Sequence, residues 1–246
     1  FIYVYYGIKL DKMKQLNYLI SFLYLLTTWN TVVFAQESEH LPPEINSEFE
    51  EREPTFSPDG KTLYFWRRNA ASNVGGVKDN GDIWMSKMEN GKWSYAVHPA
   101  APLNTPQQNF VWQVSPKHDT IWVNRILLQS GMKDAGIAYH IRNRNGEWGF
   151  QKSMEIQDYS YKGNYKDYVI TPKRVLIITN VGDDSYGGTD LYACFPINDT
   201  TWSKPVNLGP LMNTPGDEDA PFLAADGKTL FFDSNGFGNG GDHDIF

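Results

Sequence analysis

The residues best suited to chemistry lie in three loops rich in aspartate, asparagine and glycine. The loops read Lys78-Asp-Asn-Gly-Asp82, Gly182-Asp-Asp-Ser-Tyr-Gly-Gly188 and Gly236-Phe-Gly-Asn-Gly-Gly-Asp-His-Asp244. Carboxylates interleaved with glycine offer the oxygen ligands that Ca²⁺ takes in proteins. However, the D-x-[DN]-x-[DN]-G spacing with a distal glutamate is absent, and Asp and Asn also form tight turns by bonding their own backbone. We therefore interpret the loops as structural turns and expect no cofactor, with Ca²⁺ as the alternative.

Catalytic patterns are equally sparse. The five histidines show no H-x-H or H-E-x-x-H spacing, and no G-x-S-x-G nucleophile elbow occurs. Glycoside hydrolysis requires only two carboxylates at a fixed distance. Acidic residues near the expected first strands qualify by type, although their spacing favours no pair: Glu51, Glu53, Asp167, Glu218 and Asp219. The single cysteine, Cys194, lies in an apolar run, where we expect a buried small residue. The sequence favours a protein that is not an enzyme.

The elements that position these residues repeat at an interval of about 54 residues. The clearest copies are Pro54-Thr-Phe-Ser-Pro-Asp-Gly-Lys-Thr-Leu-Tyr-Phe65 and Pro221-Phe-Leu-Ala-Ala-Asp-Gly-Lys-Thr-Leu-Phe-Phe232, with degenerate copies at 112–123 and 168–178. Three sets of equivalent positions keep this register. They are the asparagines Asn46, Asn104 and Asn213, the aspartates Asp82, Asp190 and Asp244, and the tryptophans Trp93, Trp148 and Trp202. Positions repeated in this way are expected to maintain the fold, with the asparagines satisfying backbone groups between repeats and the tryptophans in the core.

Each repeat divides into four short extended runs. Turns such as Pro58-Asp59-Gly60, Asp226-Gly227 and Glu89-Asn-Gly91 separate runs rich in β-branched and aromatic residues, which is the pattern of β-hairpins. Four strands per repeat is the pattern of a β-propeller blade. We predict an all-β propeller of four-stranded antiparallel blades, with repeats at about 45–102, 103–158, 159–211 and an incomplete one at 212–246. The ring would then be truncated in this chain.

Loops of such blades sort to two faces. Short turns join strands one and two, or three and four, on one face, and the longer loops share the other face. Variable loops on a rigid scaffold usually carry function. The candidate ligand-face residues are Asp79, Asn80, Asp183, Asp184, Tyr186, Asn239 and Asp242.

The N-terminal segment has the plan of a secretory signal peptide. Met13-Lys14 precedes the apolar stretch 16–26, and the segment ends at Val33-Phe-Ala35. We predict a signal peptide at 13–35, upstream translated residues at 1–12 and a propeller at 36–246, with an uncleaved anchor as the alternative. Loss of residues 1–35 removes three lysines and one aspartate, which changes the formal net charge from −7 to −9. That charge argues against a nucleic-acid partner.

The run Pro54–Phe65 followed by Gly81-Asp-Ile-Trp84 resembles the WD40-like (PD40) repeats of TolB-type propellers. The segments Asn213–Pro221 and 240–246 resemble the variety found in exported proteins of Bacteroidetes-type bacteria. The resemblance covers about residues 45–246, and repeats two and three depart from it where Lys117-His118 and Lys173-Arg174 replace Asp-Gly. It implies the blade and little of the function, because propellers host many chemistries.

These observations lead to one main expectation. The chain is expected to be an exported periplasmic or cell-envelope propeller that binds a protein or glycan partner without catalysis, with no transmembrane segment after signal cleavage. Two alternatives stay open: the propeller part of an OmpA-like, peptidoglycan-anchored envelope protein, and a propeller glycosidase or polysaccharide lyase.

Overall fold

The computed structural model describes residues 40–124, 137–159, 167–224, 226–238 and 242–246. The chain divides into two units, and the second of them, Leu41–Phe246, contains all the secondary structure described below. The predicted signal peptide at 13–35, the residues 1–12 before it and the candidate residue Asn239 lie outside the described residues.

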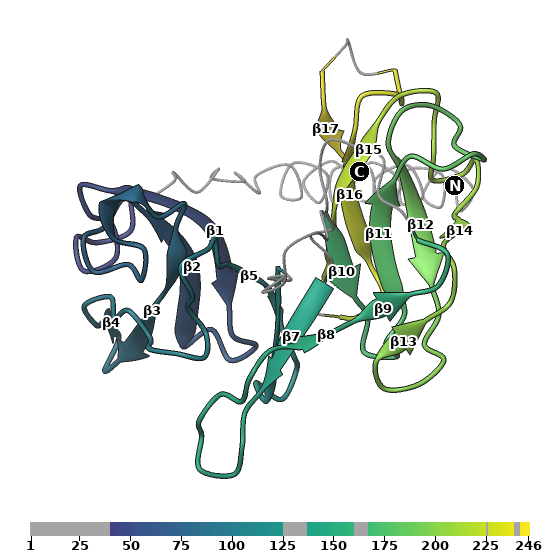
Figure 1. Cartoon of the computed structure of the whole chain (residues 1–246). Coiled ribbons are helices and arrows are strands. Elements are labelled where there is room, and N and C mark those ends of the chain that lie inside the picture. The colour runs from purple at the N-terminus through teal and green to yellow at the C-terminus, as the bar shows by residue number, and fades with distance from the viewer. Residues whose placement is uncertain (1–39, 125–136, 160–166, 225, 239–241) are drawn as a thin grey trace, which may run out of the picture. The chain divides into compact units, whose positions relative to one another are not determined.

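The predicted fold class is confirmed, because the described chain forms antiparallel sheets arranged as the blades of a four-bladed β-propeller (Figure 1). The first sheet contains β1 (Glu50–Phe56), β2 (Thr62–Arg68), β3 (Asp82–Glu89) and β4 (Lys92–Trp93), with the 3-10 turn η1 (Gly76–Lys78) in its long loop. The second contains β5 (Val111–Val114), β6 (Thr120–Asn124), β7 (Ile137–Ile141) and β8 (Lys152–Ser153). The third contains β10 (Tyr168–Ile170), β11 (Leu176–Asn180), β12 (Asp190–Cys194) and β14 (Val206–Asn207). The fourth contains β15 (Glu218–Leu223), β16 (Leu230–Ser234) and β17 (Asp244–Ile245).

A short parallel pair ties the second and third blades together. β9 (Glu155–Ile156) follows the last strand of the second blade and pairs with β13 (Thr201–Trp202) of the third. The first strands of successive blades also pack on one another, β1 on β5, β5 on β10 and β10 on β15. The first strand is therefore the inner strand of each blade.

The turn between the first and second strands has the same backbone conformation in all four blades. Gly60 and Gly227 have φ angles of 67° and 66°, and His118 and Arg174 hold the equivalent positions with φ angles of 55° and 64°. The left-handed conformation is favourable for glycine and costs other residues roughly 1–2 kcal/mol. The degenerate repeats thus keep the turn although they have lost its glycine.

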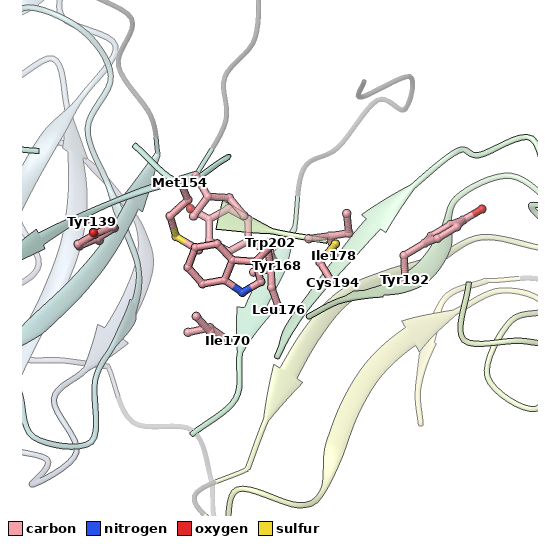
Figure 2. Packing of buried hydrophobic residues seen from close by; sticks show 10 residues of the cluster. Tyr139, Met154, Tyr168, Ile170, Leu176, Ile178, Tyr192, Cys194 and Trp202 are labelled. Carbon is pink, nitrogen blue, oxygen red and sulfur yellow. The ribbon is translucent and has the colours of Figure 1, made fainter. Parts of the chain in front are cut away.

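Blades are held together by apolar cores that alternate along the chain. One cluster joins Tyr64 and Ile83 of the first blade to residues of the second, among them Val111 and Ile121. The next cluster joins the second and third blades. Its members are Ile137, Tyr139, Met154, Tyr168, Ile170, Leu176, Ile178, Tyr192, Cys194 and Trp202, and Figure 2 shows Met154, Tyr168 and Trp202 packed together in it.

The third and fourth blades meet through Val169, Ile177 and Leu191, against which Phe232 packs. Burial on both faces explains why β11 and β12 are buried at every position and why the apolar runs Leu176–Ile178 and Leu191–Cys194 lack alternation. Cys194 is fully buried in β12, and burial raises the pKa of its thiol to about 12.

The outer face of the first blade is covered by the chain that leads into it. Ile45 is 2% exposed and packs with Leu63 and Phe65, while the carbonyl of Glu44 accepts a hydrogen bond from Ala96 N at 2.8 Å. Within the described residues, no helix is long and apolar enough to cross a membrane.

Candidate functional site

The repeated asparagines connect one blade to the next. Asn104 accepts a hydrogen bond from Ile83 N at 2.8 Å and donates to Ile83 O at 2.9 Å and Pro99 O at 2.8 Å. Asn213 likewise accepts a hydrogen bond from Leu191 N at 2.9 Å and donates to Leu191 O at 3.0 Å. It also donates to Asn207 Oδ1 at 2.8 Å. Ile83 and Leu191 are equivalent residues of third strands, so each asparagine fastens the third strand of the preceding blade. Asn46 lies at the surface and donates to Leu41 O at 2.8 Å.

The repeated aspartates organise the long loops. Asp82 and Asp190 are both fully buried. Oδ2 of Asp82 accepts hydrogen bonds from Val74 N and His98 Nε2, each at 2.7 Å. Oδ2 of Asp190 accepts them from Tyr186 N at 2.8 Å and Asn207 Nδ2 at 2.7 Å. Burial raises the pKa of Asp82, although these two hydrogen bonds lower it. Asp244, the third member of the set, is exposed.

The candidate ligand-face residues differ in their surroundings. Asp79 is 4% exposed, and its two oxygens accept hydrogen bonds from Gly75 N at 2.7 Å and Gly81 N at 2.9 Å, so it shapes its own loop. In contrast, Asn80, Asp183, Asp184 and Asp242 are exposed.

Tyr186 also reaches the surface of this face, with 49% of the residue exposed. Its backbone N–H is fixed by the buried Asp190, as described above. The ring is therefore an aromatic side chain presented to solvent from an ordered loop.

The loop of the third blade borders a pocket of about 500 Å³. Lys204 and the exposed carboxylates of Asp183 and Asp184 line it, together with Asn180 and Tyr192. The hydroxyl of Tyr192 donates to Asp184 Oδ1 at 2.8 Å, which fixes the position of that carboxylate. The pocket therefore presents both charge signs and hydrogen-bonding groups on a fixed frame.

A second hollow of about 650 Å³ lies between the second and third blades on the opposite face, among the short turns. Trp122, Tyr139 and Trp202 line it together with the cations Lys117 and Lys152. The guanidinium of Arg174, which also lines it, lies 5.0 Å from the centre of the Trp202 ring. This hollow could not be predicted from the sequence, because its wall combines residues of two repeats.

The acidic residues near the inner strands fall into two groups. Glu218 is fully buried and accepts hydrogen bonds from Thr214 Oγ1 at 2.5 Å and Ser234 Oγ at 2.7 Å. Its equivalent Glu51 accepts one from Arg67 Nε at 2.7 Å. These two carboxylates satisfy polar groups of their own blades.

The second group gathers carboxylates from three blades. Burial raises the pKa of Glu53, and the charge of Asp167 raises it further. The pKa of Asp167 is raised by burial and by Asp233. The pKa of Asp219 is raised to about 6 by burial and by the carboxylates of Asp167, Asp233 and Asp217. We refer to Glu53, Asp167, Asp219 and Asp233 as the inner carboxylate cluster.

His243 completes this group from the last described loop. Its Nδ1 lies 3.1 Å from Asp233 Oδ1, and this hydrogen bond raises the pKa of the imidazole. Neither Asp233 nor His243 is among the predicted site residues, although His243 lies in the loop 236–244 that offers ligands for Ca²⁺. The available signal was the pairing of the first and second strands, which places residue 233 opposite Asp219.

No protein family model and no curated protein matches this chain. Among solved structures, the chain is similar to the crystal structure of TolB from Acinetobacter baumannii, with 13% sequence identity and a TM-score of 0.47. The similarity covers 82% of this chain and 44% of the TolB chain, so this chain spans less than half the length of the protein that it matches. At this identity the similarity concerns the fold.

Proposed function

We propose that this chain is an exported cell-envelope propeller that binds a protein or glycan partner through its long-loop face and catalyses no reaction. The signal-peptide pattern at 13–35 supports export, and the resemblance to WD40-like repeats of TolB-type propellers supports an envelope role. The net charge of the mature region supports a partner other than nucleic acid.

The observation that carries the proposal is the construction of the third blade's loop. The buried Asp190 and Tyr192 fix the loop from beneath, Asp183 and Lys204 line the 500 Å³ pocket, and Tyr186 is exposed on the same loop. Because the loop is fixed before binding, little conformational entropy is lost when a partner docks. Exposed aromatic rings on such a frame are typical anchors of binding surfaces.

A glycosidase or polysaccharide lyase is the second candidate function. The inner carboxylate cluster favours it, because glycoside hydrolysis uses one protonated and one ionised carboxyl group. The raised pKa of Asp219, about 6, keeps a fraction of this group protonated near neutral pH. Neighbouring carboxylates also share protons for purely electrostatic reasons, and we therefore rank catalysis second.

The proposal is tested by binding of the full chain to an array of cell-envelope glycans, muropeptides and envelope proteins. Tyr186→Ala should weaken binding by about 30-fold or more, because truncation of an interface anchor costs about 2 kcal/mol or more. Tyr95→Ala is the matched control, since Tyr95 is 76% exposed and belongs to the outer part of the first blade. Equal losses for Tyr186→Ala and Tyr95→Ala, or no loss for either, would contradict a binding site on the long-loop face.

A further inference from the structure

Three polar residues of the fourth blade converge beside its inner strand. Asp219 of β15 and Asp233 of β16 are directly opposite partners in the antiparallel ladder. His243 precedes β17, whose residue Ile245 pairs with Asp233 on the other side of β16. One donor atom from each of Asp219, Asp233 and His243 lies within 4.8 Å of the other two.

This arrangement leaves a polar atom without a partner. Oδ1 of Asp219 is enclosed by protein and accepts no hydrogen bond from any residue that the structure describes. A buried carboxylate oxygen without a donor is unfavourable by roughly 1–3 kcal/mol. Native proteins rarely contain such groups unless a water or an ion satisfies them. Oδ1 of Asp82 and Oδ1 of Asp190 are unpartnered in the same way, but within the described residues only Asp219 has a second carboxylate and a histidine within 4.8 Å.

The charges around the Asp219 carboxylate are mostly negative, which makes its buried state less favourable. Like charges directly opposite each other on two strands repel, and Asp219 faces Asp233 in this way. The carboxylates of Asp167 and Asp217 add further negative charge around Asp219. Among the described neighbours that affect the pKa of Asp219, His243 is the one that lowers it. A divalent cation would supply both the missing partner for Oδ1 and the missing positive charge.

We propose that Asp219, Asp233 and His243 bind a divalent transition-metal ion of the Zn²⁺ class. Imidazole nitrogen and carboxylate oxygen are both Zn²⁺ ligands, whereas Ca²⁺ takes oxygen ligands. Bonds of roughly 2 Å place tetrahedral ligand atoms about 3.5 Å apart, so the three side chains need only small rotations to close on an ion. Asp233 and His243 are partly exposed, at 32% and 39% of their side chains, which gives an ion access from solvent and leaves a position for water.

Binding would change the tautomer of His243. Asn235 Nδ2 lies 3.2 Å from His243 Nε2, so the amide donates to Nε2 and the Nδ1 proton faces Asp233. An ion on Nδ1 replaces that proton, and the proton then belongs on Nε2. Because the ring is exposed, it can turn Nε2–H from the Asn235 amide to solvent.

The test is isothermal titration of the full chain with ZnCl₂. We expect one saturable site. Asp233→Asn and His243→Gln should each raise the dissociation constant by about 100-fold or more, because losing a ligand costs at least as much affinity as losing a group that only orients a ligand. Asp242→Asn is the matched control: it removes an exposed carboxylate next to His243 that is not part of the group, and it should bind Zn²⁺ like the unchanged chain. Far-ultraviolet circular dichroism checks that each variant is folded.

Substitution with Co²⁺ gives an independent readout. The visible spectrum of the bound Co²⁺ should change in His243→Gln if an imidazole nitrogen is a ligand. No saturable Zn²⁺ binding, or unchanged binding in both Asp233→Asn and His243→Gln, would overturn the site. Ca²⁺ binding as tight as Zn²⁺ binding and insensitive to His243→Gln would overturn the assigned class of ion.

Discussion

The sharpest prediction concerns Asn213, which fastens the third strand of the third blade. Asn213→Ala removes three hydrogen bonds from a residue that is only 2% exposed: those to Leu191 N, Leu191 O and Asn207 Oδ1. At about 1 kcal/mol for each bond, the free energy of unfolding should fall by about 3 kcal/mol.

The former partners of the Asn213 side chain set the limits of this change in the free energy of unfolding. Leu191 O still accepts a hydrogen bond from Leu208 N at 3.1 Å, and Asn207 Oδ1 still accepts one from Gly209 N at 2.7 Å. Leu191 N alone loses its partner. One unsatisfied donor keeps the loss within roughly 2–4 kcal/mol, and the melting temperature should fall by about 6–12 °C for a chain of this size.

The repeat supplies its own control. Asn46 holds the equivalent position, but it is exposed and donates to Leu41 O alone, so Asn46→Ala should cost less than about 1 kcal/mol. Urea unfolding of the full chain, followed by tryptophan fluorescence, measures both variants. Equal losses for Asn213→Ala and Asn46→Ala would refute the reasoning, because the account attributes the effect to the strand contact that only Asn213 makes.

Three further predictions concern the turns and the core. Gly60→Ala should destabilise the chain by about 1 kcal/mol, because the φ angle of 67° is unfavourable for alanine. The new Cβ would meet no described atom within 4 Å, so the φ angle is the one cost. Unfolding in urea measures the loss, and an unchanged midpoint would be inconsistent with that conformation. The carboxylate of Asp119 accepts a hydrogen bond from Ser115 Oγ at 2.8 Å, which lowers its pKa below 3.8. Its contribution is therefore present above the unfolded-state pKa and lost as the pH falls through the folded-state pKa. Asp119→Asn should lower the melting temperature at about pH 7 and lower it progressively less as the pH falls; an effect that does not shrink with falling pH would contradict this sign. Cys194, with its thiol pKa raised to about 12, should react with a thiol reagent only after unfolding, and rapid labelling of the native chain would show that β12 is not buried.

The fold class could be predicted because the same pattern of strands and turns occurs in each repeat of the sequence. Turn residues and apolar runs recur in register, and each copy supports the same four-stranded sheet. Even where Lys117-His118 and Lys173-Arg174 replace Asp-Gly, the structure keeps the left-handed turn at His118 and Arg174. Local sequence there contradicts the conformation, and packing of the neighbouring strands outweighs the cost of the strained residue.

The site was less accessible to sequence reasoning. Asp79 shares its residue type and loop context with the exposed candidates, yet it is buried and bonds the amides of Gly75 and Gly81. Burial depends on how the loop folds back, which composition does not encode. Asp233 and His243 could not be predicted as site residues, because their proximity to Asp219 arises from strand pairing within the fourth blade. The spacing of these residues in the sequence matches no known ligand motif.

The measurement that tests the central claim most directly follows the fate of a bound glycan. A glycan that the full chain binds on the array is incubated with the protein, and the mixture is analysed by chromatography. We expect saturable binding that Tyr186→Ala weakens, with the glycan recovered intact. Cleavage products that disappear in Asp167→Asn or Asp219→Asn, while the variants stay folded, would contradict it and make the inner carboxylate cluster an active site.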